Sequence, residues 1–225
     1  MSTDNQAYAG SMDRSTGASE YDAMEFIVRQ VLNRSATATL VLVKAVTPGD
    51  TSGPGSVDVQ PMVAQLDGYG NAVPHGTVFN LPVMRYQGGG NAVLIEPKVG
   101  DIGLAVFASH DISSVKQTKA PGNPGSRRRY DWADGLYIGG FLNGAVSQFV
   151  RIGDDGVTIT SASGLPVTIN APGGLVVNAD ATINGNITAT GKITTGAGST
   201  FNGKAFDSHK HTGVTTGSGT SGPPA

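Results

Sequence analysis

The feature that most constrains this chain is a long segment near the C-terminus with no aromatic side chain. No Phe, Tyr or Trp occurs from residue 150 to residue 200, and the only charged residue between Val157 and Gly191 is Asp180. Short units of Val, Ile, Leu, Thr and Asn recur there between Gly, Asn, Pro and Ser, at residues 157–160, 167–170, 175–178, 181–184, 187–189 and 193–195. An irregular repeat of strand and turn is typical of a β-helix or β-prism.

This segment cannot form a hydrophobic core from one copy. A single-chain β-helix needs several coils of about 20 residues each before stacking buries a continuous interior. Residues 151–206 would make fewer than three such coils, and their aliphatic side chains are few and of medium size. Three chains wound around one axis would bring these side chains together and pair the open sheet edges between copies. The segment therefore predicts a homotrimer.

The part before residue 150 has a different pattern. Residues 1–19 are small and polar, and we expect them to be flexible; residues 19–33 predict a short helix with an apolar face, capped at its start by the Ser19–Asp22 stretch. Strands with alternating or continuous apolar residues are predicted at 39–46, 57–63, 78–84, 92–95, 102–108, 136–142 and 148–152. Short strands in this number favour a small Greek-key barrel such as an OB-fold. A long polar connection, 109–135, is expected to be an extended loop.

These patterns predict an all-β protein with an N-terminal barrel and a trimeric β-helix or β-prism behind it. The expected segments are a flexible N-terminus with a short helix (1–37), the barrel domain (38–149), the trimeric shaft (150–206) and a C-terminal tip and tail (207–225).

Composition excludes several classes of protein. The formal net charge is −2, so bulk electrostatics do not recruit nucleic acid or an anionic membrane. Cysteine is absent, which excludes disulfides and thiolate metal sites. No apolar run reaches the roughly 20 residues that a membrane-spanning helix needs.

Two histidines one residue apart, His209 and His211, are the candidate metal ligands. In a strand, residues i and i+2 point to the same side, so both imidazoles would face one way and Lys210 the other. Two imidazoles are too few for a tight site, but three chains would supply six, enough for an octahedron. Neutral imidazole suits Fe, Ni, Cu or Zn. The alternative is a polar C-terminal pair that binds nothing.

Other polar residues carry weaker functional hypotheses. His75, in a Pro-His-Gly turn, is expected to be structural or at the surface, and no nucleophile accompanies the His110–Asp111 pair. The run Arg127-Arg128-Arg129 is expected to be solvated or to form salt bridges with a partner protein, because stacking aromatics for a single nucleic-acid strand are few. The turn 154–156 lacks the ligand spacing of a calcium loop.

Several motifs together resemble the central spike, or membrane-puncturing, proteins of contractile-tailed bacteriophages, in the group with a distinct N-terminal OB-fold domain. The motifs are Val57-Asp58-Val59-Gln60-Pro61, Asn71-Ala72-Val73-Pro74-His75-Gly76, Gly100-Asp101-Ile102-Gly103 with Phe107, Asn123-Pro124-Gly125-Ser126-Arg127-Arg128-Arg129-Tyr130, Ala133-Asp134-Gly135-Leu136-Tyr137 and Ser208-His209-Lys210-His211-Thr212-Gly213. The last of these resembles the His-x-His tip of that family. The resemblance spans residues 38–213.

The resemblance implies a trimeric needle at the tip of the tail baseplate in the virion. The OB-fold domain would attach to a baseplate hub protein, and the β-helix would form the shaft. Iron held by His209 and His211 of all three chains would close the tip, and six nitrogen ligands fit Fe(II) better than the tetrahedral Zn(II). On tail contraction the needle would be driven through the host outer membrane.

Two other functions compete with this hypothesis. A trimeric β-helical tail adhesin would recognise cell-surface glycan, but it usually needs aromatic platforms that the span 150–200 lacks. A polysaccharide-degrading enzyme would need a pair of catalytic acids in a groove, and the shaft offers only Asp154, Asp155 and Asp180. We therefore expect no enzymatic activity, no nucleic acid and no small-molecule substrate.

Overall fold

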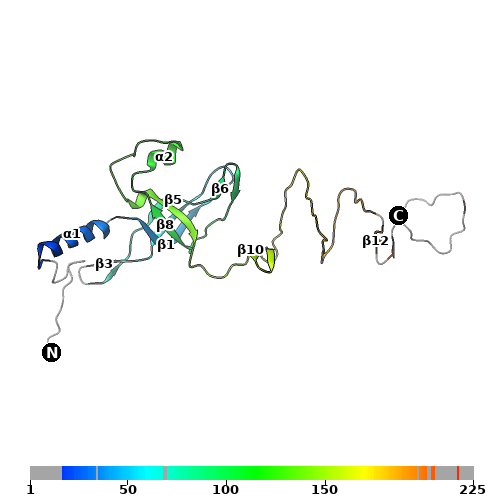
Figure 1. Cartoon of the computed structure of the whole chain (residues 1–225), viewed down its shortest axis with the longest axis horizontal. Coiled ribbons are helices and arrows are strands. Elements are labelled where there is room, and N and C mark those ends of the chain that lie inside the picture. Colours follow the sequence, from blue (N-terminus) through cyan, green and yellow to red (C-terminus); the bar gives the residue numbers. More distant parts are fainter. Residues whose placement is uncertain are drawn as a thin grey trace, which may run out of the picture. The chain divides into compact units, whose positions relative to one another are not determined.

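The computed structural model describes residues 17–33, 35–67, 70–196, 198–201, 204–205 and 217. Contacts within the chain define two units, Met1–Gly164 and Leu165–Ala225. The helices and most of the strands belong to the first unit (Figure 1). Among the described residues, no helix has the length and apolar character to cross a membrane.

Helix α1 (Glu20–Asn33) begins where the sequence predicts. The hydroxyl of Ser19 accepts a hydrogen bond from the backbone N–H of Asp22 at 3.2 Å and donates one to the Asp22 carboxylate at 2.6 Å. Ser is a preferred residue at this position because its oxygen satisfies a backbone donor that the first turn leaves free. The acidic Glu20 and Asp22 in that turn also favour the positive end of the helix dipole.

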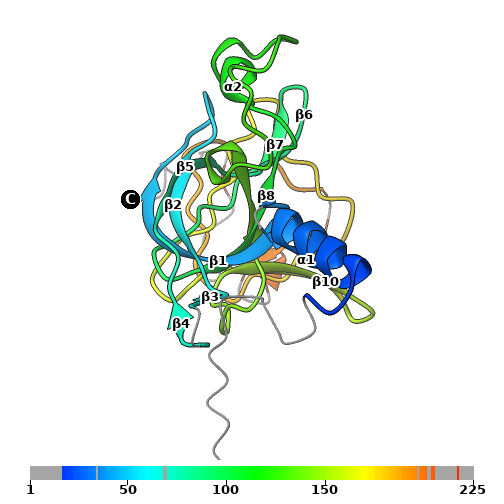
Figure 2. The same ribbon diagram turned by 90° about the vertical axis from the view of Figure 1, so that its left-hand side faces the viewer.

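Five strands form an antiparallel sheet in the order β5-β2-β1-β8-β9. They are β1 (Ala38–Thr47), β2 (Ser56–Pro61), β5 (Val78–Pro82), β8 (Ile102–Phe107) and β9 (Gly135–Gly140). The sheet curls until its two edges meet (Figure 2). At that point Val83, just after β5, forms a parallel bridge with Tyr137 in β9. The backbone N–H of Met84 donates to the Tyr137 carbonyl there at 2.8 Å.

Four small two-stranded sheets complete the strands. They are β3 (Gln65–Leu66) with β4 (Ala72–Val73), β6 (Tyr86–Gly88) with β7 (Asn91–Val93), β10 (Phe149–Gly153) with β11 (Gly156–Thr160), and β12 (Thr200–Phe201) with β13 (Lys204–Ala205). In the β10–β11 hairpin, Asp154 and Asp155 form the two-residue turn, and Gly156 follows with a φ of 114°. That backbone conformation favours glycine, which carries no Cβ.

The core lies inside the curled sheet. In β2 and β8 every second residue is buried, the period that a half-buried strand requires. The buried hydrophobic residues are Ala36, Val41, Val43, Val57, Val59, Leu81, Ala105, Phe107 and Tyr137. The structure is thus mostly β with a curled antiparallel sheet and few helices, which confirms the predicted all-β class.

The polar connection 109–135 corrects one expectation. It contains helix α2 (Ser113–Thr118) and the 3₁₀ helix η1 (Trp132–Asp134), whereas residues 119–131 between them form no helix or strand, so the prediction of an extended loop is correct only for that middle part. The polar composition of the loop did not predict these short helices. Polar contacts between residues of the loop, described below, stabilise its fold.

The described repeat units after residue 160 form no strands in one copy, and the trimeric β-helix or β-prism expected for them stays a prediction. The described residues between Thr160 and Thr200 form no strand, although the sequence predicts strands at 167–170, 175–178, 181–184, 187–189 and 193–195. The aliphatic side chains there are 55–78% exposed: Leu165, Val167, Ile169, Leu175, Val176, Val177, Ile183, Ile187 and Ile193. A strand needs hydrogen bonds to a neighbouring strand, and one copy of this segment supplies no such neighbour.

Gly103 tests the packing of the first unit. A Cβ on Gly103 would lie 2.3 Å from the ring of Tyr137 and 2.5 Å from the carbonyl oxygen of Gly139. We expect Gly103→Ala to lower the free energy of unfolding by about 1–3 kcal/mol, as overpacking does in cores. Chemical denaturation followed by the fluorescence of Trp132, the single tryptophan, measures this change. Gly144→Ala is the matched control, because nothing lies within 4 Å of its Cβ; equal effects of the two substitutions would contradict the packing.

Candidate functional site

The predicted metal ligands, His209 and His211, lie outside the described residues, so the structure places neither. The other two histidines are engaged locally. The His75 ring packs against Trp132, with centroids 5.1 Å apart, and the His75 carbonyl accepts a hydrogen bond from the Gln60 amide at 2.9 Å. The Nδ1 of His110 lies 2.8 Å from the hydroxyl of Ser109. These contacts agree with the expected structural role of His75.

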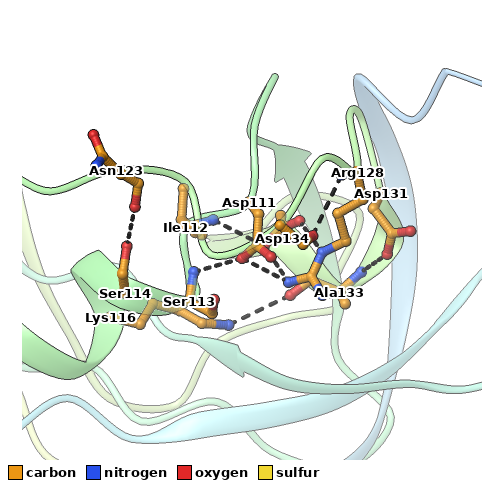
Figure 3. A network of polar contacts seen from close by, with 11 residues as sticks. Asp111, Ile112, Ser113, Ser114, Lys116, Asn123, Arg128, Asp131, Ala133 and Asp134 are labelled. Carbon is orange, nitrogen blue, oxygen red and sulfur yellow. Dashed lines mark hydrogen bonds and ion pairs between the residues drawn. The ribbon is translucent and has the colours of Figure 1, made fainter.

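The main polar cluster of the first unit is an arginine held between two buried carboxylates (Figure 3). The Arg128 guanidinium donates to both carboxylate oxygens of Asp134, with Nε at 2.7 Å and Nη2 at 2.9 Å. The same Nη2 lies 2.9 Å from Asp111 Oδ1. Asp134 is 0% exposed and Asp111 4% exposed. Paired donation of this kind to one carboxylate is among the stronger charge-assisted contacts in proteins.

Backbone donors complete the coordination of both carboxylates. The N–H of Ile112 donates to Asp134 at 3.0 Å, and the N–H of Ser113 donates to Asp111 at 2.8 Å. Figure 3 shows these contacts joining the start of α2 to the end of the same loop. We refer to Asp111, Arg128 and Asp134 with these donors as the arginine clamp.

The clamp favours the charged forms of its members. Hydrogen bonds from Ser113, and then Ser126, lower the pKa of Asp111 to about 2. The hydrogen bond from Arg128 is the largest of the causes that lower the pKa of Asp134, and burial partly opposes it. The hydrogen bond to Asp134 in turn raises the pKa of Arg128. A carboxylate held ionised by several donors is a poor general acid, so the arrangement suits a structural role better than proton transfer.

The clamp also corrects the hypothesis for the arginine run. Arg128 forms its salt bridges within the chain, whereas its neighbours Arg127 and Arg129 are exposed. Asp111 and Asp134 were not predicted from the sequence as partners of Arg128. One feature of the sequence could have indicated these partners: the Pro/Gly-rich loop has no Asp or Glu between Ile112 and Tyr130, and acidic residues lie at both of its ends. Spacing alone does not indicate which of the three arginines turns inward.

A cavity of about 170 Å³ lies beside the β1–β2 turn. Its lining includes Val46, Val83, Leu94 and Ile95 together with Asp50 and Arg85. Asp50 and Arg85 contribute to local structure: Arg85 donates to the carbonyls of Asp50 and Gly53, and the Asp50 carboxylate accepts from Ser52 and Gly53. Hydrogen bonds from Ser52 are the main cause that lowers the pKa of Asp50. The cavity thus presents an apolar wall, and two of the three charged residues that line it, Asp50 and Arg85, are engaged in local hydrogen bonds; the third is Glu96.

No group of three or more His, Cys, Asp or Glu side chains that could hold a metal occurs in the described part of the chain. In the β10–β11 turn, Asp155 pairs with Arg151. The first unit therefore offers an arginine clamp and an apolar cavity, and the candidate metal ligands belong to the C-terminal end of the chain.

Comparison with known families gives an independent finding at that end. The family model named GpV Apex motif matches residues 206–225, a span that includes both His209 and His211. This is the apex motif of phage baseplate central spike proteins, in agreement with the resemblance carried by the sequence motifs. The motif implies a spike component of a phage tail baseplate in the virion. No curated protein matches the chain at a significant level.

The clamp predicts a specific dependence of stability on pH. A carboxyl whose pKa falls on folding stabilises the protein above its unfolded pKa, about 3.9 for Asp, and loses this effect as the pH falls toward the folded value. For Asp111 that loss runs from about pH 4 to about pH 2. We expect Arg128→Leu to lower stability clearly at pH 7, because Asp134 stays buried without its cation, and the deficit to shrink below pH 4 as the carboxyls become neutral.

Denaturation midpoints of the full chain between pH 2 and pH 7 measure this dependence. Arg127→Leu is the matched control, and its free energy of unfolding should stay within about 0.5 kcal/mol of the wild type, as for most surface substitutions. A deficit for Arg128→Leu that does not change with pH would contradict the electrostatic origin.

Proposed function

We propose that this chain is the central spike of a phage baseplate, which tail contraction drives through the host outer membrane. The observation that carries the proposal is the apex motif at residues 206–225. It follows directly on the aliphatic units that remain exposed in a single copy. A segment of that kind next to an apex motif favours a narrow multi-chain shaft that ends in a tip.

A homotrimer is the assembly that we propose for the shaft. Exposed aliphatic side chains along residues 165–193 need a partner, and the absence of aromatic residues limits how much each chain can bury by itself. Three identical chains with closed symmetry would bury these side chains on one axis and pair strands that have no neighbour within their own copy.

The proposed division of labour follows the segments expected from the sequence. Residues 1–37 precede the barrel, residues 38–149 form an OB-fold that attaches to the baseplate hub protein, residues 150–206 form the shaft and residues 207–225 form the tip. The curled five-stranded sheet and its buried core support a small barrel in the second segment. The all-β shaft in this proposal is an intertwined β-helix or β-prism.

Iron is the proposed metal, held by His209 and His211 of all three chains. The donor set fits, because imidazole is a ligand of borderline softness that binds Fe(II) well. Since protein donors from three chains would supply the ligands, the ion would close the tip as a structural centre. Its contribution is to hold three chain ends together, which a penetrating point requires.

We propose a mechanical role for the protein, without enzymatic activity. The acidic residues buried in the first unit, Asp111 and Asp134, are both saturated by donors in the arginine clamp. Such groups stiffen the domain that would transmit force from the baseplate to the shaft.

Native mass spectrometry combined with elemental analysis tests the assembly and its metal together. We expect a mass three times that of the 22.9 kDa chain, with one iron for three chains. Simultaneous His209→Ala and His211→Ala should remove the iron. Simultaneous His75→Ala and His110→Ala, in the first unit, should leave the iron content unchanged. A monomer, or a trimer whose metal content does not respond to His209 and His211, would overturn the proposed tip.

Infection by phage particles that carry this chain tests the piercing role. We expect His209→Ala with His211→Ala to leave adsorption to host cells unchanged and to reduce DNA delivery, because a blunted tip would impair penetration and not recognition. A glycan-binding adhesin predicts the opposite. Particles with His209→Ala and His211→Ala would then assemble normally but fail to adsorb to host cells. Particle counts in the electron microscope control for assembly.

A further inference from the structure

Helix α1 leaves most of its apolar side chains in solvent. Six of them are 51–75% exposed: Tyr21, Met24, Ile27, Val28, Val31 and Leu32. An isolated helix of 14 residues is marginal in water, and helices in proteins are stabilised chiefly by burying an apolar face. The described residues of the same copy leave this face of α1 uncovered, so it can take a partner.

The exposed residues follow the spacing of a coiled coil. Tyr21, Met24, Val28 and Val31 are separated by three, four and three residues, which is the a/d pattern of a heptad repeat. We call these four residues the α1 seam. Ile27 and Leu32 lie beside the seam at a g position and at the e position of the next heptad, and widen it.

We propose that the α1 helices of three copies pack together in parallel along the α1 seam. The inference rests on the proposed homotrimer and adds a second contact between copies, at the N-terminal end of the chain. It assigns the seam to another copy of this chain and not to a different baseplate protein.

The chemistry of the seam favours this occupant. Its second half has β-branched Val28 and Val31 at an a and a d position, and β-branched residues at both positions shift coiled coils from two strands toward three or four. In a parallel bundle Ile27 of one helix would meet Leu32 of the next, since g residues lie beside the following e residues of a neighbour. The side chains that would meet between copies in this half of α1 are thus apolar.

Two acidic residues lie beside the seam, Glu20 at a g position and Glu25 at the e position that follows it, so a parallel bundle would bring Glu20 of one helix near Glu25 of the next. Glu25 is at an e position, and it pairs with Arg29 four residues later on its own helix. Glutamate followed by a cation at i+4 is the favourable orientation for such a pair. The pair offsets the negative charge that Glu25 would otherwise present to a neighbouring copy.

The bundle would also connect the three curled sheets. Shortly after α1, Ala36 is buried in the core, and its backbone N–H donates to the Tyr130 carbonyl at 3.0 Å. Because only a few residues separate the seam from this anchor, helices that associate would hold the attached sheets near one another. Three copies would then be joined before the shaft begins.

Disulfide cross-linking of the full chain tests this contact, because the natural sequence has no cysteine. We expect oxidised Val28→Cys to form covalent dimers from up to two of every three chains. Cysteines cross-link only when their Cα atoms lie within about 7 Å, and three seam positions meet at the axis of the bundle. Gln30→Cys, two residues away and off the seam, is the matched control and should stay monomeric on a denaturing gel. Val31→Cys provides a second seam position if Val28→Cys folds poorly.

Native mass spectrometry of the same samples separates this inference from the proposed function. A trimer in which neither seam cysteine cross-links more than Gln30→Cys overturns the inference and leaves the homotrimer intact. A monomer overturns the homotrimer itself. A third outcome is that seam cysteines form no cross-links between copies but resist alkylation in assembled tails. That result would assign the seam to another baseplate protein and would also overturn the inference.

Discussion

The constraint on which the protein depends is that the described part of its second unit buries no hydrophobic core of its own. Aliphatic side chains from Leu165 to Ile193 are more than half exposed in one copy. Hydrophobic stabilisation scales with the apolar area removed from water, so a single copy gains little by ordering this segment. The proposed homotrimer would supply this order from other copies, and it links the apex motif and the repeat before it in one physical explanation.

The first unit solves the same problem within one chain. Its curled sheet buries a continuous set of aliphatic and aromatic residues, and Gly103 lets the Tyr137 ring approach the backbone of β8. The arginine clamp then fixes the long loop against this body, with one guanidinium shared by two buried carboxylates. Removal of the Arg128 guanidinium would leave buried carboxylates without a cation, so the clamp is costly to break. It therefore gives the domain one defined loop conformation.

The two ends of the chain differ in the contacts that they would form with a neighbouring copy. In the repeat segment after residue 160 a neighbouring copy would supply both hydrophobic burial and strand pairing, because the described residues between Thr160 and Thr200 form no strand and leave their aliphatic side chains exposed. In α1 the backbone is satisfied within the helix, and only the apolar face is left over. Contacts between copies at α1 would therefore be weaker than those of the shaft and would serve chiefly to align the attached sheets.

Local patterns in the sequence determined the elements whose cause is local. The Ser19 cap set the start of α1, and period-two alternation in β2 and β8 indicated strands and their buried faces. The His209-Lys210-His211 spacing indicated a candidate metal site from residue type alone, and it stays a prediction. Only the tertiary structure decided that Arg128, and neither neighbouring arginine, pairs with Asp111 and Asp134, because that choice depends on how the loop folds back on itself. For the same reason the predicted strands of the repeat do not form in one copy: their hydrogen-bonding partners are not encoded nearby in the same chain.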